Sequence, residues 1–125
     1  MKKLLYTLFF LGFGMASQAQ DFELPVGYAF NTAEDYDLYE ADVLKCIDWL
    51  QKTPLGKEAA KRKEANAFLL VWLSGTPKVT ITIGAEAVKL MSSSPDLLMI
   101  FMGGWAKHAL VNKVKKDELG GNLAG

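Results

Sequence analysis

Cysteine, histidine and proline are scarce in this chain, which has one Cys, one His and four Pro among its 125 residues. The single cysteine, Cys46, excludes an intramolecular disulfide, so the fold has to be stabilised by packing. Structural zinc sites use four ligands that are mostly cysteine and histidine. Because the chain offers only Cys46 and His108 of these types, we predict no metal site and no cofactor.

No sign of charge dominates either, because 14 basic residues balance 14 acidic ones. Nucleic-acid binding needs a basic excess concentrated on one face. The densest basic cluster is Lys113, Lys115 and Lys116, and Asp117 and Glu118 follow it at once. Such a cluster suits the carbonyl end of a helix, where cations are favoured. We therefore predict no nucleic-acid partner.

Apolar runs long enough to cross a membrane are also missing. The apolar stretch 4–16 has 13 residues, whereas a spanning helix needs about 20. The other apolar stretch, 97–111, contains a Gly-Gly pair, Lys107 and His108. It is better interpreted as a buried helix, so we predict no stable membrane span in the mature protein.

The first twenty residues have the organisation of a secretory signal peptide. Lys2 and Lys3 precede the uncharged stretch 4–16, and Ser17-Gln18-Ala19 places small residues at the −3 and −1 positions of a signal peptidase site. We predict cleavage between Ala19 and Gln20. No cysteine stands at the end of the apolar stretch, so a lipid anchor is not expected. Cleavage removes 19 of 125 residues, leaving 106, and takes two of the 14 basic residues, leaving 12 against 14 acidic.

The remaining length favours one domain with a single hydrophobic core. The fold class that we predict is mostly α, with three main helices over 33–52, 57–73 and 95–115, a short helix over 85–92 and an extended segment over about 78–83. Along the chain we expect a signal peptide over 1–19, an extended lead-in over 20–31, one helical domain over 32–119 and a flexible tail over 120–125.

Helical periodicity and capping residues support these helices. Asn31 or Thr32 can cap the first helix, with acidic residues three positions later. One face of that helix is apolar, and it carries Tyr36, Tyr39, Val43, Cys46, Ile47 and Leu50. Every residue from 67 to 73 is apolar, which predicts burial nearly all round. Ser94-Pro95-Asp96 combines an N-cap, a first-turn proline and a first-turn acid.

Two local patterns need a tertiary explanation. Gly103-Gly104 lies inside the last predicted main helix, where each glycine costs about 1 kcal/mol relative to alanine. The pair predicts that another helix crosses closely there or that the helix bends. Residues 79–83 alternate β-branched apolar side chains with threonine, which is a strand pattern. Because one strand cannot form a sheet, we favour an extended connector or a minimal pairing.

Residues with catalytic potential are few. A Cys46–His108 pair can be proposed, and an enzyme that uses this pair or carboxylates is the alternative function, although both residues fall on predicted buried faces. The acidic stretch with Glu34, Asp35, Asp37, Glu40 and Asp42 lacks the alternating ligands and central glycine of a calcium loop. Phosphate-binding loops and nucleophile-elbow motifs are absent from the sequence. We predict no catalytic residues.

The favoured function is therefore binding of an unknown protein or a small apolar molecule. Tryptophan and methionine side chains suit such surfaces, because methionine adapts to irregular partners. Core packing is the simpler interpretation of these residue types. The candidate surface residues are Trp49, Met99, Met102 and Trp105.

Three segments resemble a group of proteins. The leader ending at Ser17-Gln18-Ala19-Gln20, the segment 66–77 (NAFLLVWLSGTP) and the segment 94–110 (SPDLLMIFMGGWAKHAL) resemble small uncharacterised exported proteins of Bacteroidota. The resemblance implies a Gram-negative envelope, periplasmic or secreted. It implies no activity and no site residues.

Overall fold

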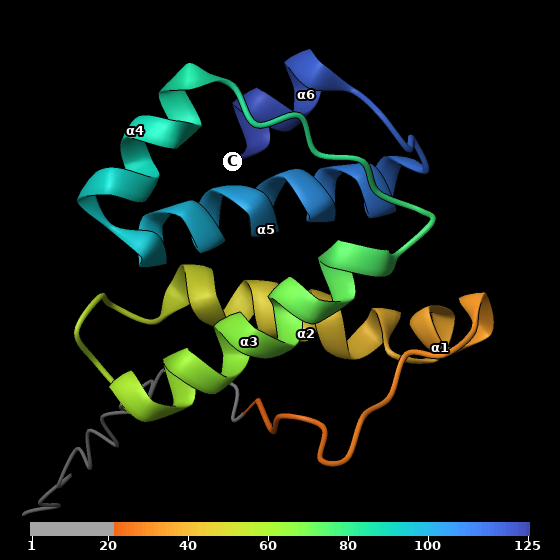
Figure 1. Ribbon diagram of the computed structural model, residues 1–125. Helices are drawn as coiled ribbons and strands as arrows, with labels where there is room; N and C mark the ends of the chain where they lie inside the picture. Colours follow the sequence, from red (N-terminus) through yellow and green to blue (C-terminus); the bar gives the residue numbers. More distant parts are fainter. Residues whose placement is uncertain (1–21) are drawn as a thin grey trace, which may run out of the picture.

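The computed structural model describes residues 22–125, apart from the side chains of Leu90, Met91 and Glu118 (Figure 1). The described residues form helices and contain no strand. The helices are α1 (Ala33–Leu38), α2 (Glu40–Lys52), α3 (Ala59–Gly75), α4 (Ala85–Ser93), α5 (Pro95–Asn112) and α6 (Glu118–Ala124). The mostly α class is confirmed. The predicted signal peptide and its cleavage point, Ala19–Gln20, lie outside the described residues.

The predicted helix over 33–52 is divided at Tyr39. The Asp35 carboxylate accepts hydrogen bonds from the backbone N–H of Asn31 (2.7 Å) and of Thr32 (2.8 Å), so the expected acidic cap is present. These bonds hold the pKa of Asp35 below its usual value. Tyr39 leaves helical geometry at φ −97° and ψ 2°. The centroid of its ring lies 5.3 Å from that of Phe30 in the lead-in. The break at Tyr39 therefore accompanies a contact with another segment, which the hydrophobic periodicity of the helix does not predict.

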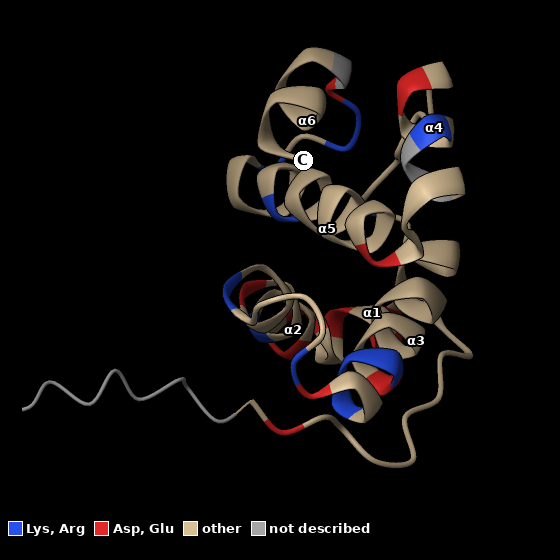
Figure 2. Cartoon of the chain, turned by 90° about the vertical axis from the view of Figure 1, so that its left-hand side faces the viewer, with Lys and Arg blue, Asp and Glu red and all other residues tan. Residues whose placement is uncertain are grey.

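The helices form two layers, with α1, α2 and α3 in one and α4, α5 and α6 in the other (Figure 2). Helix α5 contacts both α2 and α3. A Cβ on Gly103 would lie 3.3 Å from Ile47 on α2, so this glycine permits a close crossing. The apolar face predicted for the helix over 33–52 is buried on α2, where Val43, Cys46, Ile47 and Leu50 form the centre of the core. The largest fully buried side chains are Trp72, Trp105, Phe68, Ile47, Leu50 and Leu69.

Helix α3 differs from the prediction on one side. The sequence predicts burial nearly all round over 67–73, and Phe68, Leu69 and Trp72 are buried. Leu70 and Val71 are each 47% exposed, and Ala67 is exposed as well. The prediction is wrong for this side because α2 and α5 cover α3 from the core only. An apolar row is left on the outer face of the helix.

The segment 76–84 is an extended connector between the layers (Figure 1). Thr80 N–H donates to the carbonyl of Lys115 (2.8 Å), a backbone bond to the segment after α5. Val79 is buried, and Ile81 packs against the core. The alternating pattern therefore forms a connector with minimal pairing, one of the two outcomes expected.

The C-terminal residues form helix α6 where the sequence predicts a tail over 120–125. Helix α5 ends at Asn112, earlier than expected, because Lys113 takes a left-handed φ of 54°. The chain then turns, and Asp117 caps α6 by accepting from Gly120 N–H (2.9 Å). A Cβ on Gly104 of α5 would overlap the carbonyl oxygen of Ala124. Residues 118–124 can pack as a helix against α5 because Gly104 and Gly121 have no side chains that would separate the two helices.

Candidate functional site

The structure does not bring Cys46 and His108 together as a nucleophile and base. Cys46 is fully buried on α2, and its Sγ donates to the carbonyl oxygen of Ala65 (3.5 Å). Burial raises the pKa of this thiol to about 12. The thiolate is the nucleophilic form of cysteine. Cys46 is therefore a small core residue in this fold.

His108 is engaged at both ring nitrogens by other residues. Its Nε2 lies 2.9 Å from Oδ2 of Asp117, and its Nδ1 lies 3.1 Å from the amide nitrogen of Asn112. Two hydrogen bonds lower the pKa of Asp117: the larger effect comes from His108 and the smaller from the Gly120 N–H. Because Asp117 also caps α6, this pair attaches α6 to α5.

The acidic stretch does not assemble a cation site. Within residues 22–125, no group of three or more His, Cys, Asp or Glu side chains is placed to hold a metal ion. Asp37 and Glu40 instead pair with Lys78 of the connector, at 3.0 and 2.7 Å. The hydrogen bonds that Lys78 Nζ donates to Glu40, and with a smaller effect to Asp37, raise the pKa of Lys78. Asp35 in this stretch caps α1, and the ion pairs of Asp37 and Glu40 hold the connector against the layer formed by α1, α2 and α3.

The candidate surface residues Trp49, Met99, Met102 and Trp105 are all buried, with exposed fractions of 6%, 7%, 8% and 1%. They form no surface patch, which corrects the prediction. Trp49 is covered by Phe22, with ring centroids 6.5 Å apart, and by Lys61, whose Nζ lies 5.0 Å from the ring. Helix α6 covers Trp105. The covering segments come from distant parts of the chain, so helical position alone could not locate them.

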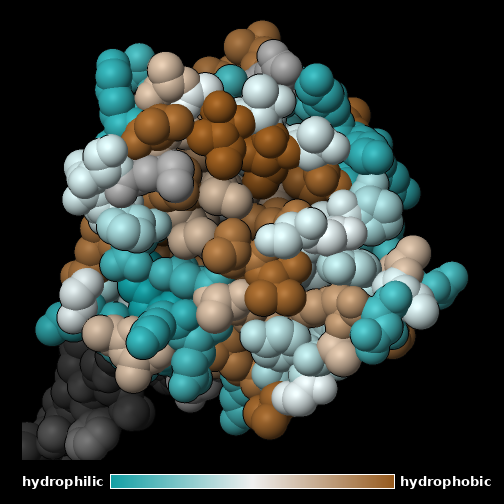
Figure 3. Space-filling model, in the orientation of Figure 1, coloured by the Kyte–Doolittle hydropathy of each residue, from teal (hydrophilic) through white to brown (hydrophobic). Residues whose placement is uncertain are grey.

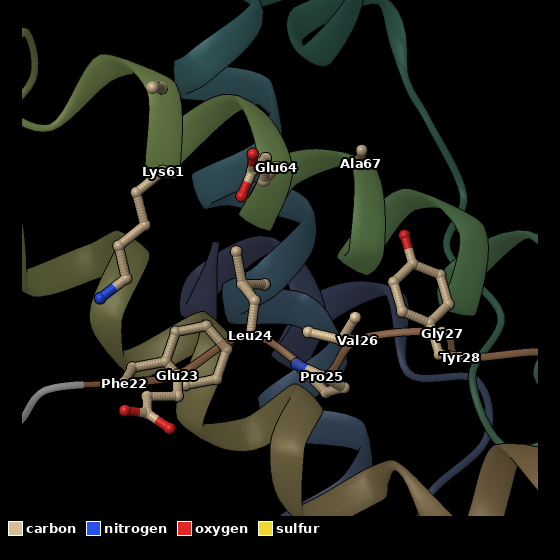
Figure 4. Close-up of a pocket in the computed structure, with 11 residues that line it drawn as sticks. Phe22, Glu23, Leu24, Pro25, Val26, Gly27, Tyr28, Lys61, Glu64 and Ala67 are labelled. Atoms are coloured by element: carbon tan, nitrogen blue, oxygen red, sulfur yellow. The ribbon is translucent and has the colours of Figure 1, made fainter.

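An open groove lies where the lead-in passes α3. Phe22 anchors one end of the lead-in against Trp49, and Tyr28 anchors the other against Phe68 at 4.9 Å between ring centroids. Between these anchors the chain arches away through Pro25 and Gly27, whose φ is +67°. The space between arch and helix is about 790 Å³. Figure 4 shows the lead-in and α3 facing each other across it.

The lining of this lead-in groove is mainly apolar. The lead-in contributes residues 22–28, and α3 contributes Ala60, Lys61, Glu64 and Ala67. At about 100° per residue, Ala60, Glu64, Ala67 and Val71 lie within about 60° of one another on α3. Val26 is 97% exposed, so its side chain is left almost entirely uncovered by the described residues. Sequence reasoning missed this groove because it assigned the whole stretch 67–73 to the core.

Apolar side chains continue from α3 onto a neighbouring face. Figure 3 shows hydrophobic residues gathered over the connector, α4, α5 and the C-terminal half of α3. Among the exposed large apolar residues on these elements are Leu70, Ile83, Val88 and Leu97. The outer side of α3 thus joins the lead-in groove to a broader apolar surface.

Comparison of the chain with protein-family models, with curated proteins and with solved structures gave no match. No helix within residues 22–125 is long and apolar enough to cross a membrane.

Proposed function

We propose that the protein is a non-catalytic, exported envelope protein that binds an apolar segment of a partner protein in the lead-in groove. The observation that carries this proposal is the open apolar groove and its continuation along the outer row of α3. Export is supported by the leader pattern of residues 1–19.

The shape of the groove favours a protein segment over a small apolar molecule. Small-molecule sites enclose roughly 70–90% of the ligand surface. The lead-in groove is open, and beyond its lining the exposed Val71 lies on the same side of α3 as Ala67, with the exposed Leu70 next to it. A segment that enters and leaves the groove would bury that row as well. Full burial of the Val26 side chain under such a segment would by itself contribute about 1.5–3 kcal/mol to the free energy of binding.

The enzyme alternative gains no support from the groove or from the core. Catalysis by cysteine needs a base within hydrogen-bond reach of the sulfur. Cys46 donates to a backbone carbonyl, and His108 is bonded to Asp117 and Asn112. We therefore propose binding, and not catalysis, as the function of this protein.

A matched pair of variants tests the groove. Ala67→Arg places a long cation in its floor, and Ala41→Arg makes the same change at an exposed position on α2. The probes are fluorescein-labelled peptides with Leu, Val or Phe at every second, third or fourth position. We expect at least one peptide to bind in a saturable way. Ala67→Arg should weaken its binding about tenfold or more, which is 1.4 kcal/mol, and Ala41→Arg less than about twofold.

Two results would contradict the proposal. The first is that no peptide of any spacing saturates the wild-type protein. The second is that Ala67→Arg and Ala41→Arg bind the same peptide equally well while both retain the wild-type far-ultraviolet circular dichroism spectrum.

A further inference from the structure

Arg62 on α3 carries a buried charge whose hydrogen bonding is incomplete. The residue is 3% exposed. Its Nη2 donates to the carbonyl of Thr53 (2.6 Å), and its guanidinium carbon lies 5.8 Å from the centroid of the Trp49 ring. The buried Nε and Nη1 have no hydrogen-bond partner among the described residues. A ring contact uses the face of the guanidinium and leaves the N–H groups at its edge unsatisfied.

An unpaired guanidinium in this position is costly. Arginine stays protonated, and Nε and Nη1 together carry three of its five N–H donors. The ion pairs found between described residues do not include Arg62. Buried charges in proteins are normally paired, and buried donors normally bonded. An anionic acceptor beside Arg62 would remove both penalties.

A separate pocket adjoins this side chain. Its volume is about 320 Å³, and its lining comprises Gly56, Ala59, Arg62, Lys63, Asn66 and Asp96. The pocket lies at the start of the 17-residue helix α3, where Glu58 supplies no side-chain cap. First-turn N–H groups have no acceptor within a helix, and the helix dipole favours negative charge there.

The positive groups outnumber the single carboxylate in the pocket. Arg62 and Lys63 are cationic, whereas Asp96 contributes one negative charge and is engaged by Asn66, whose Nδ2 donates to Asp96 Oδ1 (3.0 Å). At about 100° per residue, Arg62 and Asn66 lie at least about 100° around α3 from Ala60, Glu64 and Ala67, and the linings of the pocket and the groove share no residue. This pocket and that groove are therefore two distinct sites.

We propose that this pocket binds a small oxyanion, a carboxylate or a phosphate, whose oxygens accept hydrogen bonds from Arg62 and from the first turn of α3. Because Nε and Nη1 are themselves buried, contact with them requires a small shift of the atoms that cover them. The turn 53–58 lies next to this guanidinium, because the Thr53 carbonyl accepts from Nη2. Gly56, with φ +83°, lies in that turn. Asp96 opposes the anion, so it limits affinity.

The test uses inorganic phosphate and acetate, each titrated into the purified protein at constant ionic strength. Backbone amide shifts in two-dimensional NMR report the site. We expect saturable shifts centred on residues 56–63 for at least one of the two anions. Phosphate alone would identify a phosphate ligand, and acetate alone a carboxylate. Absence of saturable shifts with both anions would overturn the proposal.

Variants separate specific binding from general attraction to lysines. Arg62→Met should weaken binding at least about tenfold, Lys63→Gln several-fold, and Asp96→Asn should tighten it several-fold. Lys89→Gln, a change at an exposed lysine on α4, should leave affinity unchanged.

If Arg62→Met does not fold, the affinities of Lys63→Gln and Asp96→Asn for the anion decide whether the pocket binds it. Unchanged affinity in both Lys63→Gln and Asp96→Asn would overturn the proposal. So would an equal loss of affinity in Lys63→Gln and Lys89→Gln.

Discussion

Cys46 illustrates how burial determines the chemistry of one side chain in this fold. The residue is fully buried, and burial raises the pKa of its thiol to about 12. At neutral pH the thiolate fraction is then negligible, and reaction with electrophiles requires the thiolate. The sequence predicted the buried position from helical periodicity, and the environment of the thiol follows from that position.

We expect the native protein to resist thiol-reactive disulfide reagents at pH 7 and to react once denatured. The measurement is the rate of colour release with and without guanidinium chloride. Rapid labelling of the native protein would show that Cys46 is accessible and would contradict the burial described here.

Trp49 and Trp105 show where residue-level prediction fails. Their helices were predicted correctly, but their exposure depends on Phe22, Lys61 and α6, which come from distant parts of the chain. Periodicity reports which face of a helix is apolar. It does not report which other segment covers that face. The same reason explains why the outer row of α3 was assigned to the core.

At the scale of elements, α6 is the clearest departure from expectation. Residues 118–124 contain two glycines, which are weak helix formers, so local propensity predicted a tail. Its helix forms because Asp117 caps it and because Gly104 and Gly121 allow it to lie against α5. The Gly103-Gly104 pair predicted either a close crossing or a bend; the structure has the close crossing, and α6 as a second neighbour of this pair was not predicted.

Gly104→Ala tests the docking of α6 on α5. The added methyl group would overlap the backbone of Ala124. We expect a loss of about 1–3 kcal/mol in the free energy of unfolding, as for other overpacked sites, measured by chemical denaturation. Gly84→Ala is the control, because a Cβ there meets nothing within 4 Å. Equal stability of the two variants would contradict the packing.

Low pH should release α6 through Asp117. Its folded-state pKa is lowered, first by the hydrogen bond from His108 and then by that from Gly120. The stabilisation is therefore complete above the unfolded pKa of about 3.9 and is lost as the pH falls through the lower folded value. We expect hydrogen exchange of the amides in 118–124 to lose protection over that range, after correction for intrinsic exchange. Asp117→Asn should remove this pH dependence, and its persistence in that variant would count against the assignment.

At the scale of the whole molecule, the mostly α class and the main helical regions were predicted from sequence, because hydrophobic periodicity and caps are local signals. The arrangement in two layers was not predictable, since it depends on contacts between α5 and the pair α2 and α3. The lead-in groove depends on how residues 22–28 pack against α3, and the pocket beside Arg62 depends on the approach of Asp96 on α5 to α3, so neither could be located from the sequence.

The leader makes a prediction about the mature protein. Intact-mass measurement and N-terminal sequencing of protein purified from the cell envelope of its host should identify a chain that begins at Gln20. Ala19→Arg should block cleavage, because the signal peptidase site needs a small residue at that position. A mature protein that retains Met1 would show that the segment is not removed.

The central claim is that the lead-in groove holds a segment of a partner protein. Its most direct test is photo-crosslinking in the producing cell, with a photoreactive amino acid at position 67 in the groove or at position 41 on the exposed side of α2. We predict a discrete protein adduct from position 67 that is absent from position 41. No adduct from position 67, or the same adducts from both positions, would contradict the claim.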